Sequence, residues 1–176
     1  IDAALFPGLA ADDAIQSVPT LILDNSFRWT GVVDMNEVRN AIRLRDPAKL
    51  GVDSLKSMIV NGDAFQLADM MIRAEKIFVS FVDLLVHEEF STRLGAMAAA
   101  EELVEQRPDI ARQIVDPLLN RFEDRIDQIK GDVLYIIGQA GDRRIIPFLN
   151  RILSGPYSVE VKEAAQEAVE NLSAKT

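Results

Sequence analysis

The stretch SVPTLILDNSFRWTG, residues 17–31, is the only part of the chain whose pattern predicts β-structure. Three adjacent apolar residues at 21–23 lie between a proline and the turn-forming sequence DNS. Such a run predicts a strand that is covered on both faces, and Asp and Asn tolerate the left-handed backbone of a tight turn. The following FRWTG, residues 27–31, alternates aromatic with polar residues, which predicts a half-buried partner strand. We therefore expect a β-hairpin.

Short helical segments flank this hairpin. Residues 2–15 carry apolar anchors for a turn or two of helix, limited by a Pro-Gly pair at 7–8. After the hairpin, Asp34 and Glu37 have the spacing of a capping box for a helix with the sequence DMNEVRNAIRL. A proline at 47 ends this segment. The expected apolar face of the helix consists of Met35, Val38, Ala41 and Ile42.

From residue 48 onward the pattern is helical throughout. Gly62 and Asp63 supply a stop and a new N-cap between two helical segments. Beyond residue 75 a repeat is present in three segments, residues 92–103, 129–140 and 161–172, which match in their small and aliphatic positions. Each has a basic residue in second place, and these basic residues are 37 and 32 positions apart, a spacing typical of two-helix repeats. The basic residues are Arg93, Lys130 and Lys162.

A bulkier helical segment precedes each of these three: residues 77–88, 111–124 and 144–153. Pro117 and Pro147 recur at equivalent places in the last two, each followed by two large apolar residues. Because a proline inside a helix costs about 3 kcal/mol, its recurrence predicts a first-turn position or a built-in bend.

This alternation of bulky and small helices, with its recurring proline and a GD linker, resembles HEAT and HEAT-like repeats over residues 76–173. The resemblance implies a mainly α fold, with an α–α superhelix whose neighbouring units complete each other's core. An ordinary irregular helical bundle is the alternative.

The opening segment resembles the second half of a thioredoxin fold over residues 1–44. The resemblance rests on a short helix, SVPT, an apolar strand, a tight turn, a second strand ending in glycine, and a terminal helix. It implies that Ile1-Asp2 closes a preceding strand and that the Val18–Pro19 bond is cis. It also implies a peptide-binding loop made of Ser17, Val18, Pro19 and Thr20.

The family's Cys-x-x-Cys and first strands have no counterpart here, and a lone hairpin is marginally stable. The favoured explanation is a fragment of a longer protein. Alternatively, another chain supplies the missing strands, or the hairpin leans on the helical part. An unpaired hairpin edge would recruit a partner or a second copy of the chain.

The residue composition disfavours or excludes several classes of partner and of catalytic site. With 28 acidic and 19 basic residues, the net charge of −9 disfavours nucleic acid and anionic membranes as partners. The absence of cysteine excludes thiolate catalysis and sulfur-containing zinc sites within these residues. Nothing predicts a metal, a cofactor or a catalytic residue, and VHEEF around His87 is expected to be a solvated helix end. No apolar run is long enough to form a membrane-spanning helix, and no signal peptide is recognisable, so a cytoplasmic location is expected.

The expected organisation is a partial thioredoxin-like domain (1–46), connecting helices (47–75) and a HEAT-like repeat domain (76–176). The leading function is a non-catalytic protein-interaction module that binds its partner on the acidic small-helix or concave face. The alternative is a fragment of a thiol–disulfide oxidoreductase whose Cys-x-x-Cys lies upstream of Ile1. A third hypothesis is a HEAT-like domain of the lyase or maturation type, in which the repeat surface would present a prosthetic group.

Overall fold

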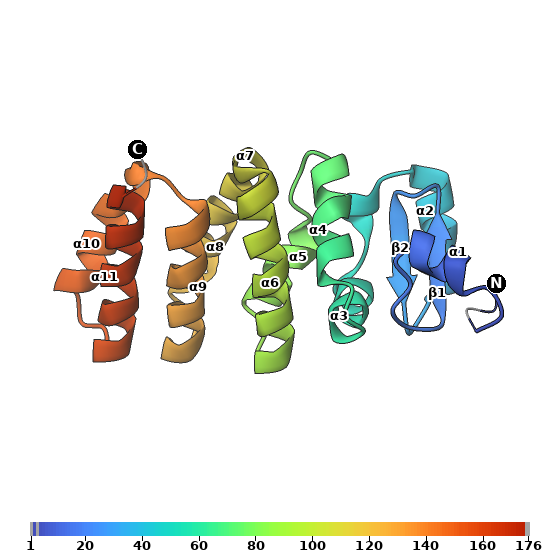
Figure 1. The fold of residues 1–176 in the computed structure, drawn as a ribbon. Helices are drawn as coiled ribbons and strands as arrows, with labels where there is room; N and C mark the ends of the chain where they lie inside the picture. The colour runs from blue at the N-terminus through green and yellow to red at the C-terminus, as the bar shows by residue number, and fades with distance from the viewer. Residues whose placement is uncertain (1, 3, 175–176) are drawn as a thin grey trace.

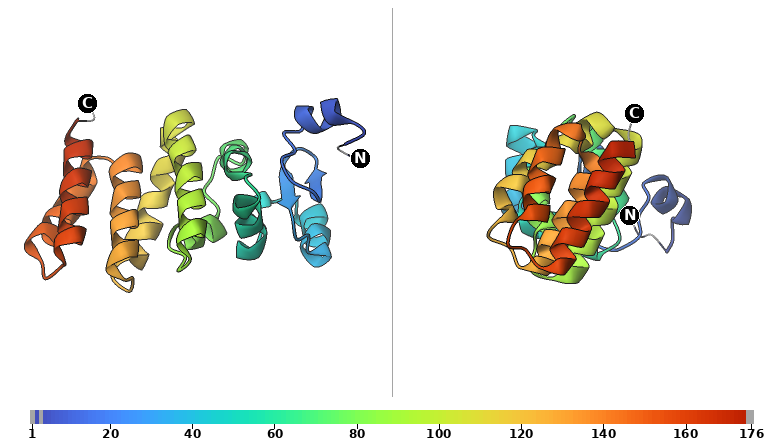
Figure 2. Two further views of the ribbon diagram at one scale, coloured as in Figure 1. Left: turned by 60° about the horizontal axis from the view of Figure 1, so that its bottom comes forward. Right: turned by 90° about the vertical axis from the view of Figure 1, so that its left-hand side faces the viewer.

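A computed structural model describes residue 2 and residues 4–174, and within them the chain is mainly helical with one small antiparallel sheet. The elements form an elongated row with the hairpin at one end and the last helix pair at the other (Figure 1). A second view shows the same order and places the first helix to one side of the row (Figure 2). The strand end expected at Ile1 lies outside the described residues.

The N-terminal elements are α1 (Pro7–Asp12), β1 (Thr20–Leu23), β2 (Phe27–Thr30), α2 (Met35–Leu44), the 3-10 turn η1 (Pro47–Lys49), α3 (Val52–Val60) and α4 (Ala64–Arg73). The following elements are α5 (Val79–Leu85), α6 (Phe90–Gln106), α7 (Pro108–Ala111), η2 (Arg112–Ile114), α8 (Val115–Phe122), α9 (Asp127–Ala140), η3 (Arg143–Ile145), α10 (Ile146–Ser154) and α11 (Val159–Ala174).

The hairpin is present, but the burial of its two strands differs from the prediction. Asp24 and Asn25 both have φ near +50°, as a tight turn between antiparallel strands requires. All of β1 is only half-buried, so the strand is not covered on both faces. All of β2 is buried, including Arg28 and Thr30, which the alternation had placed toward water. The partner that makes this burial tolerable is Asp63, described below.

Helix α2 begins at its predicted cap, because the Asp34 side chain accepts a hydrogen bond from the Asn36 N–H. The capping box is incomplete, since the Glu37 carboxylate bonds to other elements instead. The apolar face is also narrower than expected. Val38 and Ala41 are buried, but Met35 and Ile42 are exposed because no element of the described residues covers that side of the helix.

The three predicted small-residue segments lie on α6, α9 and α11, which stand side by side with α4 in one layer (Figure 1). Helices α5, α8 and α10 form the second layer and pair with α6, α9 and α11 respectively. Close packing explains the small residues, because a Cβ on Gly138 of α9 would lie 3.0 Å from the Cα of Ala168 on α11. Pro117 and Pro147 both lie in first helical turns, one of the two placements predicted.

Polar side chains also connect successive helix pairs. Arg121 of α8 pairs with Asp83 of α5 at 2.9 Å. The Tyr135 hydroxyl donates to Glu101 and the Tyr157 hydroxyl to Glu123, each across 34 positions of sequence. Such nearest-neighbour contacts are what a repeating helical stack provides.

Candidate functional site

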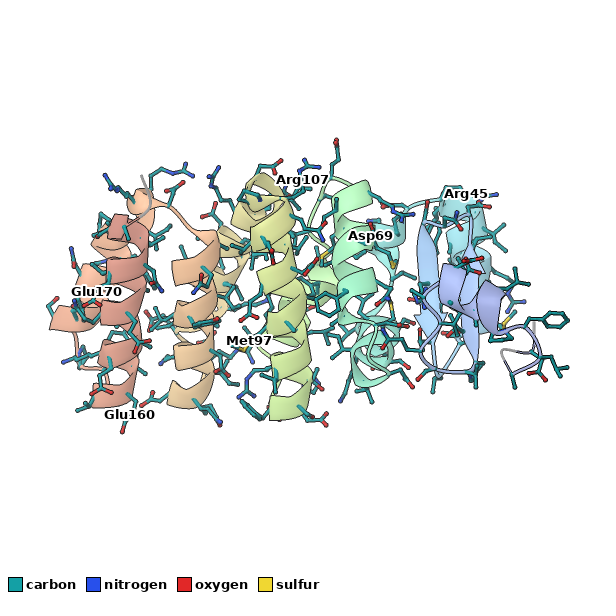
Figure 3. The ribbon with its side chains drawn as sticks, viewed as in Figure 1. Arg45, Asp69, Met97, Arg107, Glu160 and Glu170 are labelled. Carbon is teal, nitrogen blue, oxygen red and sulfur yellow. The ribbon has the colours of Figure 1, made fainter. Side chains whose placement is uncertain are left out.

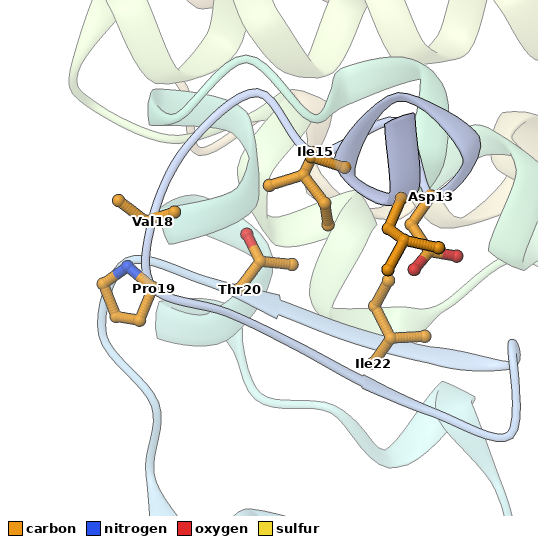
Figure 4. A pocket seen from close by; sticks show the side chains of 8 residues that line it. Asp13, Ile15, Val18, Pro19, Thr20 and Ile22 are labelled. Carbon is orange, nitrogen blue, oxygen red and sulfur yellow. The ribbon is translucent and has the colours of Figure 1, made fainter. Parts of the chain in front are cut away.

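A groove with a volume of about 550 Å³ lies beside the predicted peptide-binding loop. Val18, Pro19 and Thr20 of that loop line it, together with Ile22 of β1. The opposite wall comes from the α1 region and consists of Leu9, Ala10, Asp13 and Ile15. Figure 4 shows the groove between this wall and β1. It is mostly apolar, with one carboxylate.

The fourth predicted loop residue, Ser17, faces the helical body rather than the groove. Its hydroxyl donates to the Asn61 carbonyl at 3.4 Å, and its own carbonyl accepts from the Thr20 hydroxyl at 2.6 Å. The Val18–Pro19 bond is cis, as predicted. Gly31 N–H donates to the Pro19 carbonyl at 2.9 Å, so the loop is held from both sides.

This last bond also fixes which way the groups of β1 point. Antiparallel strands alternate between hydrogen-bonded and non-bonded residue pairs. Since Pro19 and Gly31 form a bonded pair, Leu21 and Leu23 direct their backbone groups toward β2. Thr20 and Ile22 therefore direct theirs toward the opposite edge, where the described residues place no third strand. The outer edge of β2 is different, because the Ser57 hydroxyl donates to the Thr30 carbonyl.

Arg28 holds the α1 region over this hairpin. Its Nη1 and Nη2 donate to the carbonyls of Asp13 and Ala14 at 3.0 and 2.8 Å. Its Nε donates to Asp63 Oδ2 at 3.0 Å, and the Thr30 hydroxyl donates to the same oxygen. Asp63 is fully buried and precedes α4, but its side chain makes no cap bond there. One buried carboxylate thus ties the groove wall, the hairpin and α4 together.

The Glu37 carboxylate joins the other face of the hairpin to the start of α3. It accepts from the Trp29 indole N–H at 2.7 Å, from the Ser54 hydroxyl and from the Gly51 N–H at the start of α3. These bonds attach the hairpin to the helical part, and they leave open which of the three explanations accounts for the missing strands. Sequence analysis assigned both carboxylates to helix caps and did not find these partners, because no motif relates the partners to the two acids.

A second candidate surface is the outer side of the layer formed by α6, α9 and α11. Eight carboxylates lie on these helices without an ion pair to any described residue: Glu101, Glu102, Glu105, Asp127, Glu160, Glu163, Glu167 and Glu170. Glu160 and Glu170 lie along α11 in Figure 3.

Little positive charge offsets these carboxylates. Of the three basic residues on the same helices, Arg93 is buried and paired with Asp132. Lys130 is half-buried over the rings of Phe122 and Tyr157. Only Lys162 remains, so this outer side, which we call the acidic face, carries a strong net negative charge.

The opposite layer has a different composition. The segment from α7 to α10 exposes Arg112, Arg143, Arg144 and Arg151. Some of these are neutralised locally, as when Arg144 pairs with Asp142 at 2.8 Å. The excess of unpaired carboxylates over exposed basic side chains therefore lies on the side of α6, α9 and α11.

His87 lies in the loop between α5 and α6 rather than at a helix end. Its Nδ1 accepts from the Glu89 N–H, and its carbonyl accepts from Arg93. Glu89 bonds to Lys56, Ser91 and Thr92, and these bonds lower the pKa of its carboxyl to about 2. Among the described residues no group of three histidine, cysteine or acidic side chains is arranged to hold a metal ion.

Comparison with protein-family models, curated proteins and solved structures finds no match for this chain. In the part of the chain that the structure describes, no helix has the length and apolar character needed to cross a lipid bilayer.

Proposed function

We propose that this chain is a protein-interaction module in which HEAT-like helical repeats present the acidic face to a basic segment of a partner protein. One observation carries the proposal: eight carboxylates on one helical layer have no ion-pair partner among the described residues, while exposed arginines belong to the other layer. Such one-sided charge costs stability through self-repulsion, and a basic partner relieves it.

The open row supports this function. No helix of the described residues covers the outer side of α6, α9 and α11, which extends along the row (Figures 1 and 2). Stacked repeats commonly bind partners along such an extended surface.

The proposal is tested by titrating the chain with a labelled, unstructured peptide rich in lysine and arginine, and measuring fluorescence anisotropy at several salt concentrations. We expect the affinity to fall with salt, because exposed charges are screened beyond about 10 Å at 0.1 M. The double variant Glu163→Gln/Glu167→Gln should bind about threefold to fivefold more weakly, since an exposed ion pair contributes about 0.2–1 kcal/mol.

Asp116→Asn/Asp124→Asn is the matched control, because it removes the same charge from exposed carboxylates of the opposite layer. Circular dichroism should show that both variants remain folded. Equal weakening by both variants would mean that net charge alone attracts the peptide, and the acidic face would lose its assignment.

A second candidate keeps the thioredoxin-like interpretation of residues 1–44, in which the chain is a fragment of a thiol–disulfide oxidoreductase. What supports it is the groove formed at the predicted loop, where Val18, Pro19 and Thr20 gather beside an apolar wall. These residues contain no cysteine, so the redox chemistry would need a Cys-x-x-Cys from sequence preceding Ile1. Sequencing the gene upstream decides this, since absence of that motif removes the oxidoreductase.

A further inference from the structure

We propose that the acidic face binds its basic partner segment in an extended conformation, with one large apolar side chain of the partner seated on Leu94, Met97 and Tyr135. We call these three residues the apolar patch. A lysine or arginine about three positions from that anchor meets Glu101 and Glu105. This inference rests on the proposed function, because it specifies the segment that the acidic face would bind.

The first argument is one stripe of α6 that changes from apolar to acidic along its length. Leu94, Met97, Glu101 and Glu105 follow one another at intervals of three or four residues, which places them on one side of the helix. Leu94 is 54% exposed, Met97 is half-buried, and both glutamates are exposed. Met97 lies on the side of α6 that faces α9 (Figure 3). The apolar residues therefore share a surface with the carboxylates.

Helix α9 completes the apolar patch. The Tyr135 hydroxyl donates to Glu101 at 2.7 Å, so its partly exposed ring borders the junction of the apolar and acidic parts. The two helices run in the same direction (Figure 1), and Gly131 precedes Tyr135 by one turn as Met97 precedes Glu101. No atom of another described element lies within 4 Å of a Cβ added at Gly131. This position therefore leaves room for a partner's side chain beside Leu94 and Met97.

The second argument, charge, selects the occupant. Glu101, Glu102 and Glu105 form no ion pair with any described residue. They lie near the C-terminus of α6, where the helix dipole also favours a cation. A second copy of this chain fits poorly, because each copy carries a net charge of −9 and like charges oppose association. The patch therefore suits a heterologous segment that combines an apolar anchor with lysine or arginine.

The size of the apolar patch indicates an extended segment. A docked amphipathic helix needs apolar contacts over several turns, but on α6 the exposed stripe becomes acidic after Met97. The helical rise of 1.5 Å per residue places Leu94 about 10 Å from Glu101 along the axis. An extended chain covers that distance in about three residues. One anchor with a basic residue at that spacing matches the surface.

The test compares two labelled peptides of equal charge by fluorescence anisotropy. One contains Lys-Lys-Ser-Ser-Trp between Gly-Ser flanks, and in the other serine replaces the tryptophan. The tryptophan peptide should bind about fivefold or more tightly, since aromatic side chains carry much of the binding energy of interfaces. Equal affinities would overturn this inference and leave the proposed function standing. Failure of both peptides to show salt-dependent binding would overturn the proposed function itself.

A peptide with the order Lys-Lys-Trp-Ser-Ser tests the spacing at constant composition. It should bind about as weakly as the serine peptide, because its tryptophan lies too close to the lysines to reach the apolar patch while they meet Glu101 and Glu105. Equal affinity of the two tryptophan peptides would contradict the assigned spacing.

Two variants of the chain test the position of the anchor. Leu94→Ser should remove the advantage of the tryptophan peptide and leave the affinity of the serine peptide unchanged. Gly131→Gln should do the same by filling the space beside Met97. Val79→Ser is the matched control, because Val79 is an exposed aliphatic residue of α5 in the opposite layer. A loss of the advantage in Val79→Ser as well would remove the assignment to the apolar patch.

NMR of the unmodified chain keeps the proposal falsifiable if a variant folds poorly. The tryptophan ring should shift the methyl resonances of Leu94 and Met97, and the serine peptide should not. Shifts confined to other methyl groups would overturn the proposal. Sedimentation of the chain alone should show a monomer, whereas self-association that Leu94→Ser abolishes would assign the apolar patch to a second copy instead.

Discussion

Two buried arginines, one in the hairpin and one in the row of helices, each bind a carboxylate and backbone carbonyls, but their surroundings differ. Arg28 on β2 donates its Nε to Asp63 and its remaining nitrogens to the carbonyls of Asp13 and Ala14. Arg93 on α6 donates its Nε to Asp132 at 2.7 Å and Nη1 to the carbonyls of His87 and Glu88. Each arginine thus fastens an irregular segment onto a regular element.

The two pairs differ in the solvent exposure of the carboxylate. The Asp63 side chain is 0% exposed and that of Asp132 is 19% exposed. They also differ in what else holds the region. The helical row has close packing among alanines and glycines, whereas the hairpin adds two carboxylates, Asp63 and Glu37, to the apolar packing of Phe27 and Trp29 against the core. Polar anchors should therefore matter more at the hairpin end, and close packing more in the row.

The largest effect is expected from Asp63→Ala. It leaves the Arg28 guanidinium and the Thr30 hydroxyl buried beside an empty position, and breaking a fully buried pair costs about 3–5 kcal/mol. Asp132→Ala should cost about 1–2 kcal/mol, because water reaches the site and Arg93 keeps its carbonyl acceptors. Urea unfolding followed by circular dichroism measures both. Equal losses of free energy would contradict the proposed dependence on burial.

In the row, a single methyl group tests the packing. Gly138→Ala places a Cβ 3.0 Å from the Ala168 Cα and 3.1 Å from its Cβ, so α9 and α11 must separate at a cost of about 1–3 kcal/mol. Gly131→Ala on the same helix is the matched control. Nothing lies within 4 Å of its new methyl group, so it should stabilise the chain by about 0.5–1 kcal/mol. Thermal unfolding distinguishes these opposite signs.

Glu37→Gln tests the second anchor of the hairpin. An amide has one acceptor oxygen for three donors, so at least one of Trp29, Ser54 and Gly51 loses its partner, at a cost of about 1–2 kcal/mol. The fluorescence of Trp29, the single tryptophan, should also change as its indole N–H is disturbed. Glu105→Gln, an exposed substitution on α6, should alter neither measurement.

The smallest effect is a dependence on pH. The pKa of Glu89 is lowered from 4.5 to about 2, chiefly by its bond to Lys56 and then by Ser91 and Thr92. A lowered pKa in the folded state means that this stabilisation is complete above pH 4.5 and is lost as the pH falls toward 2. The free energy of unfolding of the unmodified chain should therefore fall toward that of Glu89→Gln as the pH decreases across that range. Urea unfolding at successive pH values measures both free energies.

Glu88→Gln is the control for this series, because the Glu88 carboxylate forms no ion pair with the described residues. The difference in free energy of unfolding between Glu88→Gln and the unmodified chain should stay constant across the same pH range. A constant difference for Glu89→Gln as well would show that the bond to Lys56 contributes nothing in solution.

Prediction from sequence succeeded where the signal is local. The turn at Asp24-Asn25, the cap at Asp34 and the first-turn placement of Pro117 and Pro147 each depend on residues within a few positions. The positions of the small-residue helices followed from the recurrence of small and aliphatic residues at matching positions of three segments.

The errors have one physical cause. Alternation placed Arg28 toward water, because a strand's own sequence does not reveal a carboxylate 35 residues away that makes burial tolerable. Glu37 had capping-box spacing, but its carboxylate bonds to Trp29, Ser54 and Gly51 instead. The apolar residues of α2 predict a wider buried face than the structure has, because within the described part of the chain no element packs over Met35 and Ile42.

The sequence by itself therefore determined the order of elements, the hairpin turn, the helix repeat and the acidic composition, since each arises from short-range backbone preferences or from residue counts. Only the tertiary structure decided which carboxylates are buried, which edge of the hairpin pairs with no strand of the described residues, and that the unpaired acids share one side of the row. Those features depend on contacts between different elements, such as Arg28 with Asp63 at 35 positions, and no local pattern encodes which side chains of different elements will meet.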